Sequence, residues 1–155
     1  MHERHASYLT SDELQCDAVR ITGGVQDRLE TAARFAAEAG LEVWYCPFTN
    51  GLDRAGLLAF VLDGAERAER LRQGGAAVVY LTGSEISMFT DGFLPGRDLA
   101  ERMALFTDPM RMRAAIPAAR AAVQDFLAEA VPAVRAFHAL TDYGRTRRMA
   151  RNRAT

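Results

Sequence analysis

The stretch AAVVYLTGSE, at residues 76–85, combines a short apolar run, a turn of small residues and a carboxylate. A continuous apolar run bounded by turn residues is typical of a parallel strand that is buried on both faces, so we predict a strand over residues 76–82. In parallel α/β folds the chemistry gathers at the carboxyl ends of such strands. Glu85 is therefore the first candidate for a functional residue.

The chain before this stretch alternates between strand patterns and helix patterns. Apolar residues at spacings of three and four, followed by glycines, predict helices over residues 25–39 and 57–72. We predict strands over residues 17–22 and 41–48, and Asp53 is placed to cap the second helix. Because consecutive strand–helix units build a parallel sheet, we expect an α/β fold.

The chain after residue 83 has a different pattern. A loop over residues 83–96 precedes a short helix near residues 98–105 and an alanine-rich helix over residues 110–137. Pro117 and Pro132 are expected to limit or kink the long helix, because proline removes a backbone donor and its ring clashes with the preceding turn.

The two ends of the chain differ from its middle. We expect an irregular lead-in at residues 1–15, one α/β domain at residues 16–140 and an arginine-rich, disordered tail at residues 141–155. Five arginines fall among the last eleven residues, with almost no apolar pattern around them. Three interpretations are open for this tail: a solvated end, a basic arm for nucleic acid or an acidic partner, or an out-of-frame translation product.

The composition excludes several classes of protein. A chain of 155 residues is long enough for one domain with a substantial core. Its formal net charge of -1 leaves no overall field that favours nucleic acid or a membrane surface. The two cysteines, Cys16 and Cys46, have no metal-binding spacing, and we expect no metal. No signal peptide and no apolar run of about 18 residues is visible, so a cytoplasmic protein without membrane spans is expected.

Four residues in or just after the predicted strands are candidates for binding a substrate. Ser84 could orient Glu85 or contact a ligand, and it could also be a simple turn residue. Arg20 lies inside the first strand, where it either binds a ligand or pairs with a carboxylate. Trp44 and Tyr45 are neighbours in the second strand and must face opposite sides, so an aromatic platform for a sugar and core packing are both open.

The loop at residues 86–96 is unusually apolar, which indicates that it folds over something: a pocket, one end of the sheet or a partner. Asp91 within it is a further candidate substrate-binding residue, although Asp-Gly is also a common turn. Gly23-Gly24 resembles half of a phosphate loop. The sequence contains neither GxGxxG nor a P-loop, so we expect no cofactor.

Three segments carry a resemblance to a known family: CDAVRITGG at residues 16–24, GLEVWYCPF at 40–48 and VVYLTGSEISMFTDGFLPG at 78–96. They resemble strands two, three and four of TIM-barrel glycoside hydrolases, and are closest to a group of glycosidase-like barrel proteins of which some are catalogued as abortive infection proteins. In the retaining clan the fourth strand ends in Asn-Glu, and that glutamate is the acid/base. The resemblance implies this role for Glu85.

Two departures from the family limit what the resemblance implies. Ser84 stands where the clan has asparagine, and the chain lacks strands five to eight, which include the strand that carries the nucleophile. Retaining chemistry needs two carboxylates, so we expect a partial (β/α)8 barrel, a fragment or truncated form, that is inactive alone. A carbohydrate ligand is the expected partner.

Two alternatives to the partial barrel belong to other classes. The first is a non-catalytic interaction protein that forms homo-oligomers through the edges of its half-barrel. The second is a flavodoxin-like sheet that binds a small anion near Gly23-Gly24.

Overall fold

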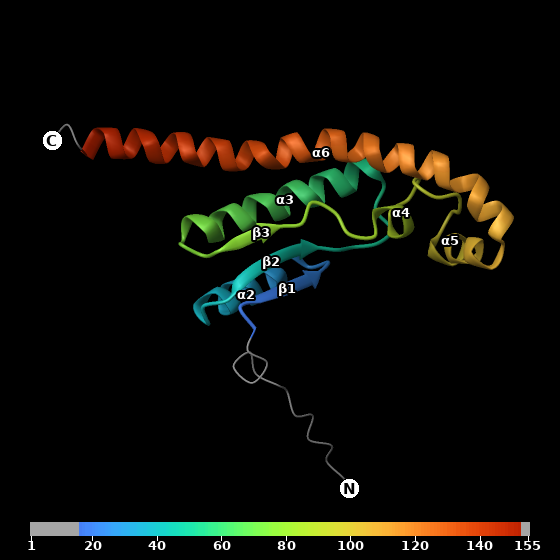
Figure 1. Cartoon of the computed structure of the whole chain (residues 1–155), viewed down its shortest axis with the longest axis horizontal. Helices are drawn as coiled ribbons and strands as arrows, with labels where there is room; N and C mark the ends of the chain where they lie inside the picture. The colour runs from blue at the N-terminus through green and yellow to red at the C-terminus, as the bar shows by residue number, and fades with distance from the viewer. Residues whose placement is uncertain (1–15, 153–155) are drawn as a thin grey trace, which may run out of the picture.

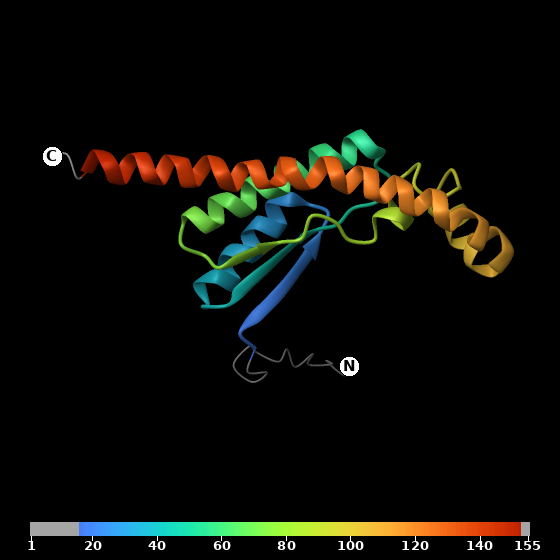
Figure 2. The same cartoon turned by 45° about the horizontal axis from the view of Figure 1, so that its top comes forward.

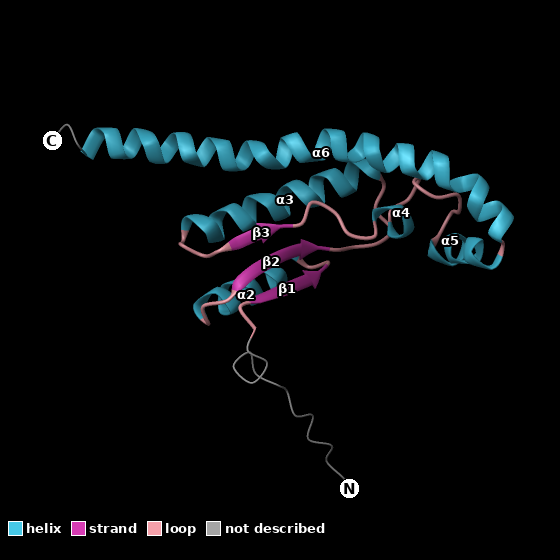
Figure 3. Cartoon of the chain, in the orientation of Figure 1, coloured by secondary structure: helices cyan, strands magenta, loops and turns pink. Residues whose placement is uncertain are grey.

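The computed structural model describes residues 16–152, and the side chains of residues 16–138. The predicted lead-in at residues 1–15 lies outside the described residues. The chain alternates between strands and helices, which confirms the expected α/β class (Figures 1 and 3). The elements are β1 (Ala18–Gly23), α2 (Gln26–Glu38), β2 (Glu42–Pro47), α3 (Arg54–Gln73), β3 (Val78–Tyr80), α4 (Ile86–Phe89), α5 (Leu99–Ala104), the 3-10 helix η1 (Leu105–Thr107) and α6 (Pro109–Asn152).

The three strands form one parallel sheet in the order β1-β2-β3. The register places Arg20 beside Trp44, and Trp44 beside Val79. In a flavodoxin-like sheet the first strand lies between the second and the third. Here the second strand lies in the middle, so the flavodoxin-like alternative is wrong for these three strands.

Helices α2 and α3 cover one face of the sheet. Leu29 and Ala33 of α2 and Ala68 of α3 meet Val43 and Tyr45 of β2 in a single buried cluster. Alternation along the strands directs Arg20, Trp44 and Val79 to the opposite face. No described helix packs on that face, and Trp44 is 42% exposed and Val79 39%. Parallel sheets are normally covered by helices on both faces. We call the face that no described helix covers the bare face.

The long helix α6 packs along α3 and continues past it (Figures 1 and 2). Phe126 and Ala130 of α6 are fully buried against Leu57 and Val61 of α3. Neither Pro117 nor Pro132 ends the long helix, because α6 runs through both to Asn152. The kink expected at these prolines stays a prediction. Burial of the flanking residues compensates for the backbone hydrogen bonds that the prolines remove: Ala130 packs against α3 near Pro132, and Ala115 and Ala119 pack with Met88 and Leu94 around Pro117.

The end of α6 lies beyond the predicted domain boundary at residue 140. Its backbone is helical over residues 141–152, where a disordered tail is expected. The division of the chain at residues 15 and 140 stays a prediction. Within residues 16–152, no helix combines the length and the apolar composition that crossing a membrane requires.

The capping residue and the glycine identified in the sequence lie at the observed ends of helices α2 and α3. The Asp53 carboxylate accepts a hydrogen bond from Gly56 N at 2.8 Å, which confirms the predicted cap, although α3 begins at Arg54 and not at Leu57. Gly40, at φ +80°, follows the last turn of α2 as predicted. The third strand is shorter than predicted, since it pairs only over Val78–Tyr80.

Candidate functional site

Arg20 links the carboxyl ends of the strands on the bare face. Its guanidinium Nη2 donates to Ser84 Oγ at 3.0 Å and lies 3.1 Å from Cys46 Sγ. These residues come from β1, from the turn after β3 and from β2. Arg20 pairs with no described carboxylate, so the ion pair expected as the alternative to ligand binding is absent from the described residues. The contact instead covers Cys46, whose exposure is 0%.

Glu85 occupies a special backbone position at the same edge of the sheet. Its φ of 54° lies in the left-handed region, which non-glycine residues adopt only when the surrounding structure compensates for the strain. Its backbone carbonyl accepts from Met88 N and Phe89 N, which starts α4 at the end of the turn that follows β3. The Glu85 carboxylate has no hydrogen bond or ion pair with any described residue, and the residue is exposed.

The two neighbouring aromatic residues of β2 have different environments. Trp44 lies on the bare face, where its Nε1 donates to Glu42 at 2.6 Å. Tyr45 is 0% exposed, stacks on Tyr80 and donates to Gln26 at 3.2 Å. Burial raises the pKa of the Tyr45 hydroxyl well above its usual value. We therefore correct the expectation for Tyr45, which belongs to the core and is out of reach of a ligand.

The loop at residues 86–96 is held by a buried arginine, Arg102 of α5. Its Nε donates to Met88 O at 2.7 Å, and its Nη1 lies 2.8 Å from the Asp91 carboxylate. Asp91 N also donates to Leu52 O at 2.8 Å. Asp91, predicted to bind substrate, therefore neutralises Arg102 and anchors the loop. Sequence reasoning missed Arg102, because nothing in the sequence distinguishes it from the exposed arginines around it.

A cavity of about 630 Å³ lies between this loop and the first part of α6. Glu85 lines it, together with Met88 and Leu94 of the anchored loop. The apolar loop therefore forms one wall of a pocket, which is one of the three roles expected for it from the sequence. Met112 and Ile116 of α6 form the facing wall.

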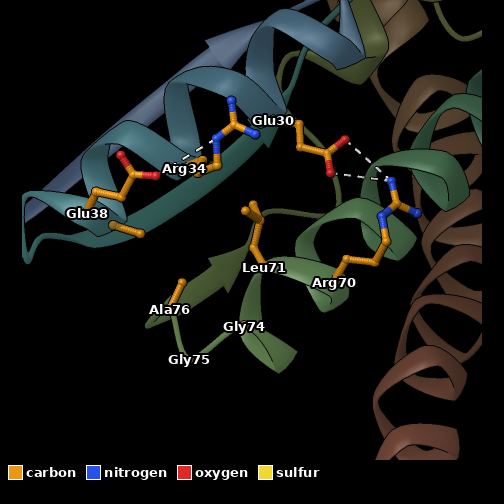
Figure 4. A pocket seen from close by; sticks show the side chains of 9 residues that line it. Glu30, Arg34, Glu38, Arg70, Leu71, Gly74, Gly75 and Ala76 are labelled. Atoms are coloured by element: carbon orange, nitrogen blue, oxygen red, sulfur yellow. Dashed lines mark hydrogen bonds and ion pairs between the residues drawn. The ribbon is translucent and has the colours of Figure 1, made fainter.

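A second cavity, of about 520 Å³, lies at the opposite end of the sheet, near the last turns of α2 and α3 (Figure 4). Its charged groups neutralise one another: Glu30 pairs with Arg70 at 3.3 Å, and Glu38 with Arg34 at 4.0 Å. This cavity therefore offers a ligand few free charges, and the carboxyl end of the sheet is the better candidate site.

Gly23-Gly24 has a packing explanation. A Cβ on Gly24 would lie 2.9 Å from the carbonyl oxygen of Phe48, so the close approach of the two chain segments requires glycine there. Gly24 therefore has a structural role that requires no phosphate. Among the described residues, no group of three His, Cys, Asp or Glu side chains could hold a metal ion.

Comparison with known proteins identifies no family. No protein-family model matches the sequence, and no curated protein matches it either. The function must therefore be argued from the site itself.

Proposed function

We propose that the chain is part of a glycosidase-like (β/α)8 barrel, with its bare face as the interior of the barrel and a carbohydrate site at the carboxyl ends of the strands. One observation carries the proposal. Consecutive parallel strands have both crossover helices on one face, while the other face bears Trp44 and Arg20. A barrel has this arrangement, since its helices lie outside and its site lies at the carboxyl ends.

In this proposal each site residue has a chemical role. Trp44 offers the apolar face of a sugar a stacking surface, and Arg20 and Ser84 offer hydrogen bonds to hydroxyl groups. Glu85, as a carboxylic acid, donates its proton to the glycosidic oxygen while the bond from that oxygen to the anomeric carbon breaks.

Hydrolysis by retention also needs a carboxylate that attacks the anomeric carbon from the other side. Among the residues that line the cavity, Glu85 is the one acidic side chain, and Asp91 is engaged by Arg102. We therefore expect the chain alone to bind sugar without cleaving it. Release of 4-nitrophenol from 4-nitrophenyl glycosides, lost in Glu85→Gln, would show that the chain is active by itself.

Sugar binding can be followed through Trp44, the single tryptophan of the chain. Titration with methyl glucoside, galactoside and mannoside should change its fluorescence in a saturable way. Arg20→Ala should weaken this binding, whereas Arg28→Ala, an exposed arginine of α2, is the matched control. A fluorescence signal that no methyl glycoside changes contradicts the sugar site.

A second candidate function is self-association. Two exposed apolar side chains, Trp44 and Val79, are neighbours on the bare face, and β1 and β3 each have an unpaired edge among the described strands. Such a surface favours pairing between copies of the chain. Light scattering should then detect a dimer that Trp44→Ser dissociates and that Phe35→Ser, at an exposed site on α2, does not. A monomer at all concentrations rules this function out.

A further inference from the structure

The cavity beside Glu85 extends along the first half of α6. Four apolar side chains of this helix line it, at spacings of four, three and four residues: Met112, Ile116, Ala119 and Val123. This spacing places them on one face of the helix, as a stripe about 16 Å long at a rise of about 1.5 Å per residue. Met88 and Leu94 of the anchored loop line the other side, and both are buried. We call this hollow the α6 groove.

Large apolar side chains are exposed in and near the groove, where η1 is followed by α6 (Figure 1). Phe106 and Ile116 line the groove and are 60% and 52% exposed. Met103 and Met110, in the same part of the chain, are 52% and 77% exposed. Half of the eight large apolar side chains that are exposed among the described residues thus fall between residues 103 and 116. Such a concentration is typical of a surface that a partner covers, and flexible methionine side chains adapt readily to a partner.

A positive edge runs beside the apolar stripe of α6. Residues 109–124 contain three arginines and no acidic residue. Arg113 and Arg120 are seven residues apart, so they lie on the same face of the helix, about 10 Å apart along its axis. Both are exposed, and neither makes a side-chain hydrogen bond or ion pair with any described residue. Asp91, on the loop opposite, is already paired with Arg102, so it does not neutralise this edge.

The shape and the charges of the groove together favour one class of occupant. A flat anionic bilayer would not reach Met88 and Leu94, which are each 7% exposed at the bottom of the groove. A second copy of the chain would bring its own arginines against Arg113 and Arg120. A small anion with one carboxylate would engage only one of the two guanidiniums and would leave most of the stripe uncovered. A helix with an acidic edge meets both requirements along its whole length.

We infer that the α6 groove binds an amphipathic helix of a partner protein. Helices dock in apolar grooves through side chains at spacings of three and four residues. The apolar face of the partner would cover Phe106 and Ile116. Carboxylates seven residues apart along its edge would accept charge-assisted hydrogen bonds from Arg113 and Arg120. This inference does not depend on a carbohydrate site on the bare face, because no residue of β1, β2 or β3 lines the groove.

A designed peptide tests the inference with the full chain. The probe is a fluorescein-labelled peptide of alanine and glutamine, with four leucines at the spacing of the α6 stripe and two glutamates seven residues apart beside them. A matched peptide has lysine in place of each glutamate. Fluorescence anisotropy should show saturable binding of the glutamate peptide, at least about fivefold tighter than that of the lysine peptide.

Variants of α6 locate the binding. Ile116→Glu should abolish it, because a charge then stands in the apolar stripe. Arg120→Glu should weaken binding of the glutamate peptide about fivefold and strengthen that of the lysine peptide, a reversal that misfolding would not produce. Arg111→Glu is the matched control, because Arg111 lies nine residues before Arg120, on the opposite side of the helix. It should leave both affinities nearly unchanged.

Several outcomes overturn the inference. Absence of peptide binding, equal affinities for the two peptides, and equal effects of Arg111→Glu and Arg120→Glu each contradict a helix in the groove. If instead Ile116→Glu abolishes binding of phosphatidylserine vesicles or of dodecanoate, or dissociates a dimer of the chain, that occupant replaces the partner helix. The response of Trp44 to methyl glycosides depends on none of these results, so the proposed function is tested separately.

Discussion

The Asp91 carboxylate accepts from the guanidinium of Arg102 at 2.8 Å, although the Arg102 side chain is 1% exposed and that of Asp91 43%. This ion pair joins α5 to the loop that forms one wall of the cavity. The same guanidinium donates to Met88 O, so a single side chain sets the path of the loop. The geometry of the candidate site therefore depends on a residue that does not line it.

Asp91→Ala should destabilise the fold, because it leaves the buried Arg102 without its counter-charge. We expect a loss of about 1–3 kcal/mol in the free energy of unfolding, measured by urea denaturation. Glu66→Ala is the control, since it removes an exposed partner of Arg70 and should cost less than about 1 kcal/mol. Equal effects of the two variants would contradict the anchoring role of Asp91.

The stability of the protein should fall at alkaline pH because of Tyr45 and Tyr80. Burial raises the pKa of both hydroxyls, and both donate hydrogen bonds, to Gln26 and to Val61 O. The folded state thus keeps two protons that the unfolded state loses above its ordinary pKa of about 10. The stabilisation is complete below that pH and declines as the pH rises, by up to about 1.4 kcal/mol per pH unit for each tyrosine.

Urea denaturation between about pH 9 and pH 11 measures this decline. Tyr45→Phe should reduce the decline of the free energy of unfolding with pH by the contribution of one ionising group, because phenylalanine has no group that ionises. A slope that the substitution leaves unchanged would show that other groups cause the alkaline loss.

Gly64 allows α3 to approach the sheet closely. A Cβ at this position would lie 2.9 Å from both Pro47 Cγ and Tyr80 Oη. Gly64→Ala should therefore cost about 1–3 kcal/mol, despite the better helix propensity of alanine. Gly64→Ser, with one more atom, should cost more, as thermal or urea denaturation will show. If Gly64→Ala is stabilising, helix propensity outweighs the steric contact.

Cys46 should become reactive when Arg20 is removed. Its thiol is fully buried beneath the Arg20 guanidinium, which lies 3.1 Å from the sulfur. In a Cys16→Ser background, Arg20→Ala should accelerate the reaction of Cys46 with a disulfide reagent several-fold, as measured by absorbance. Arg28→Ala should leave the rate as it is. The same slow rate in the Arg20 variant would mean that other groups bury the thiol.

Local sequence patterns were sufficient for the α/β class and for the order of strands and helices. These predictions used apolar periodicity, the Asp53 cap and the glycine after α2. Each of these features depends on residues within about one turn, so it can be recognised in a single sequence. The length of α6 was not predictable in this way. Packing of Phe126 and Ala130 against α3 supports a helix that its two prolines would locally interrupt.

The sequence by itself determined where the candidates lie along the chain: Arg20 and Trp44 inside the first two strands, and Ser84 and Glu85 after the third. The tertiary structure alone decided which of the candidates are accessible. In the folded chain Tyr45 is buried under the helices and Asp91 pairs with Arg102. Helix α6 lies beside Glu85, where the two line a cavity. These outcomes depend on contacts between distant segments, such as α5 with the loop, and local periodicity carries no information about such contacts.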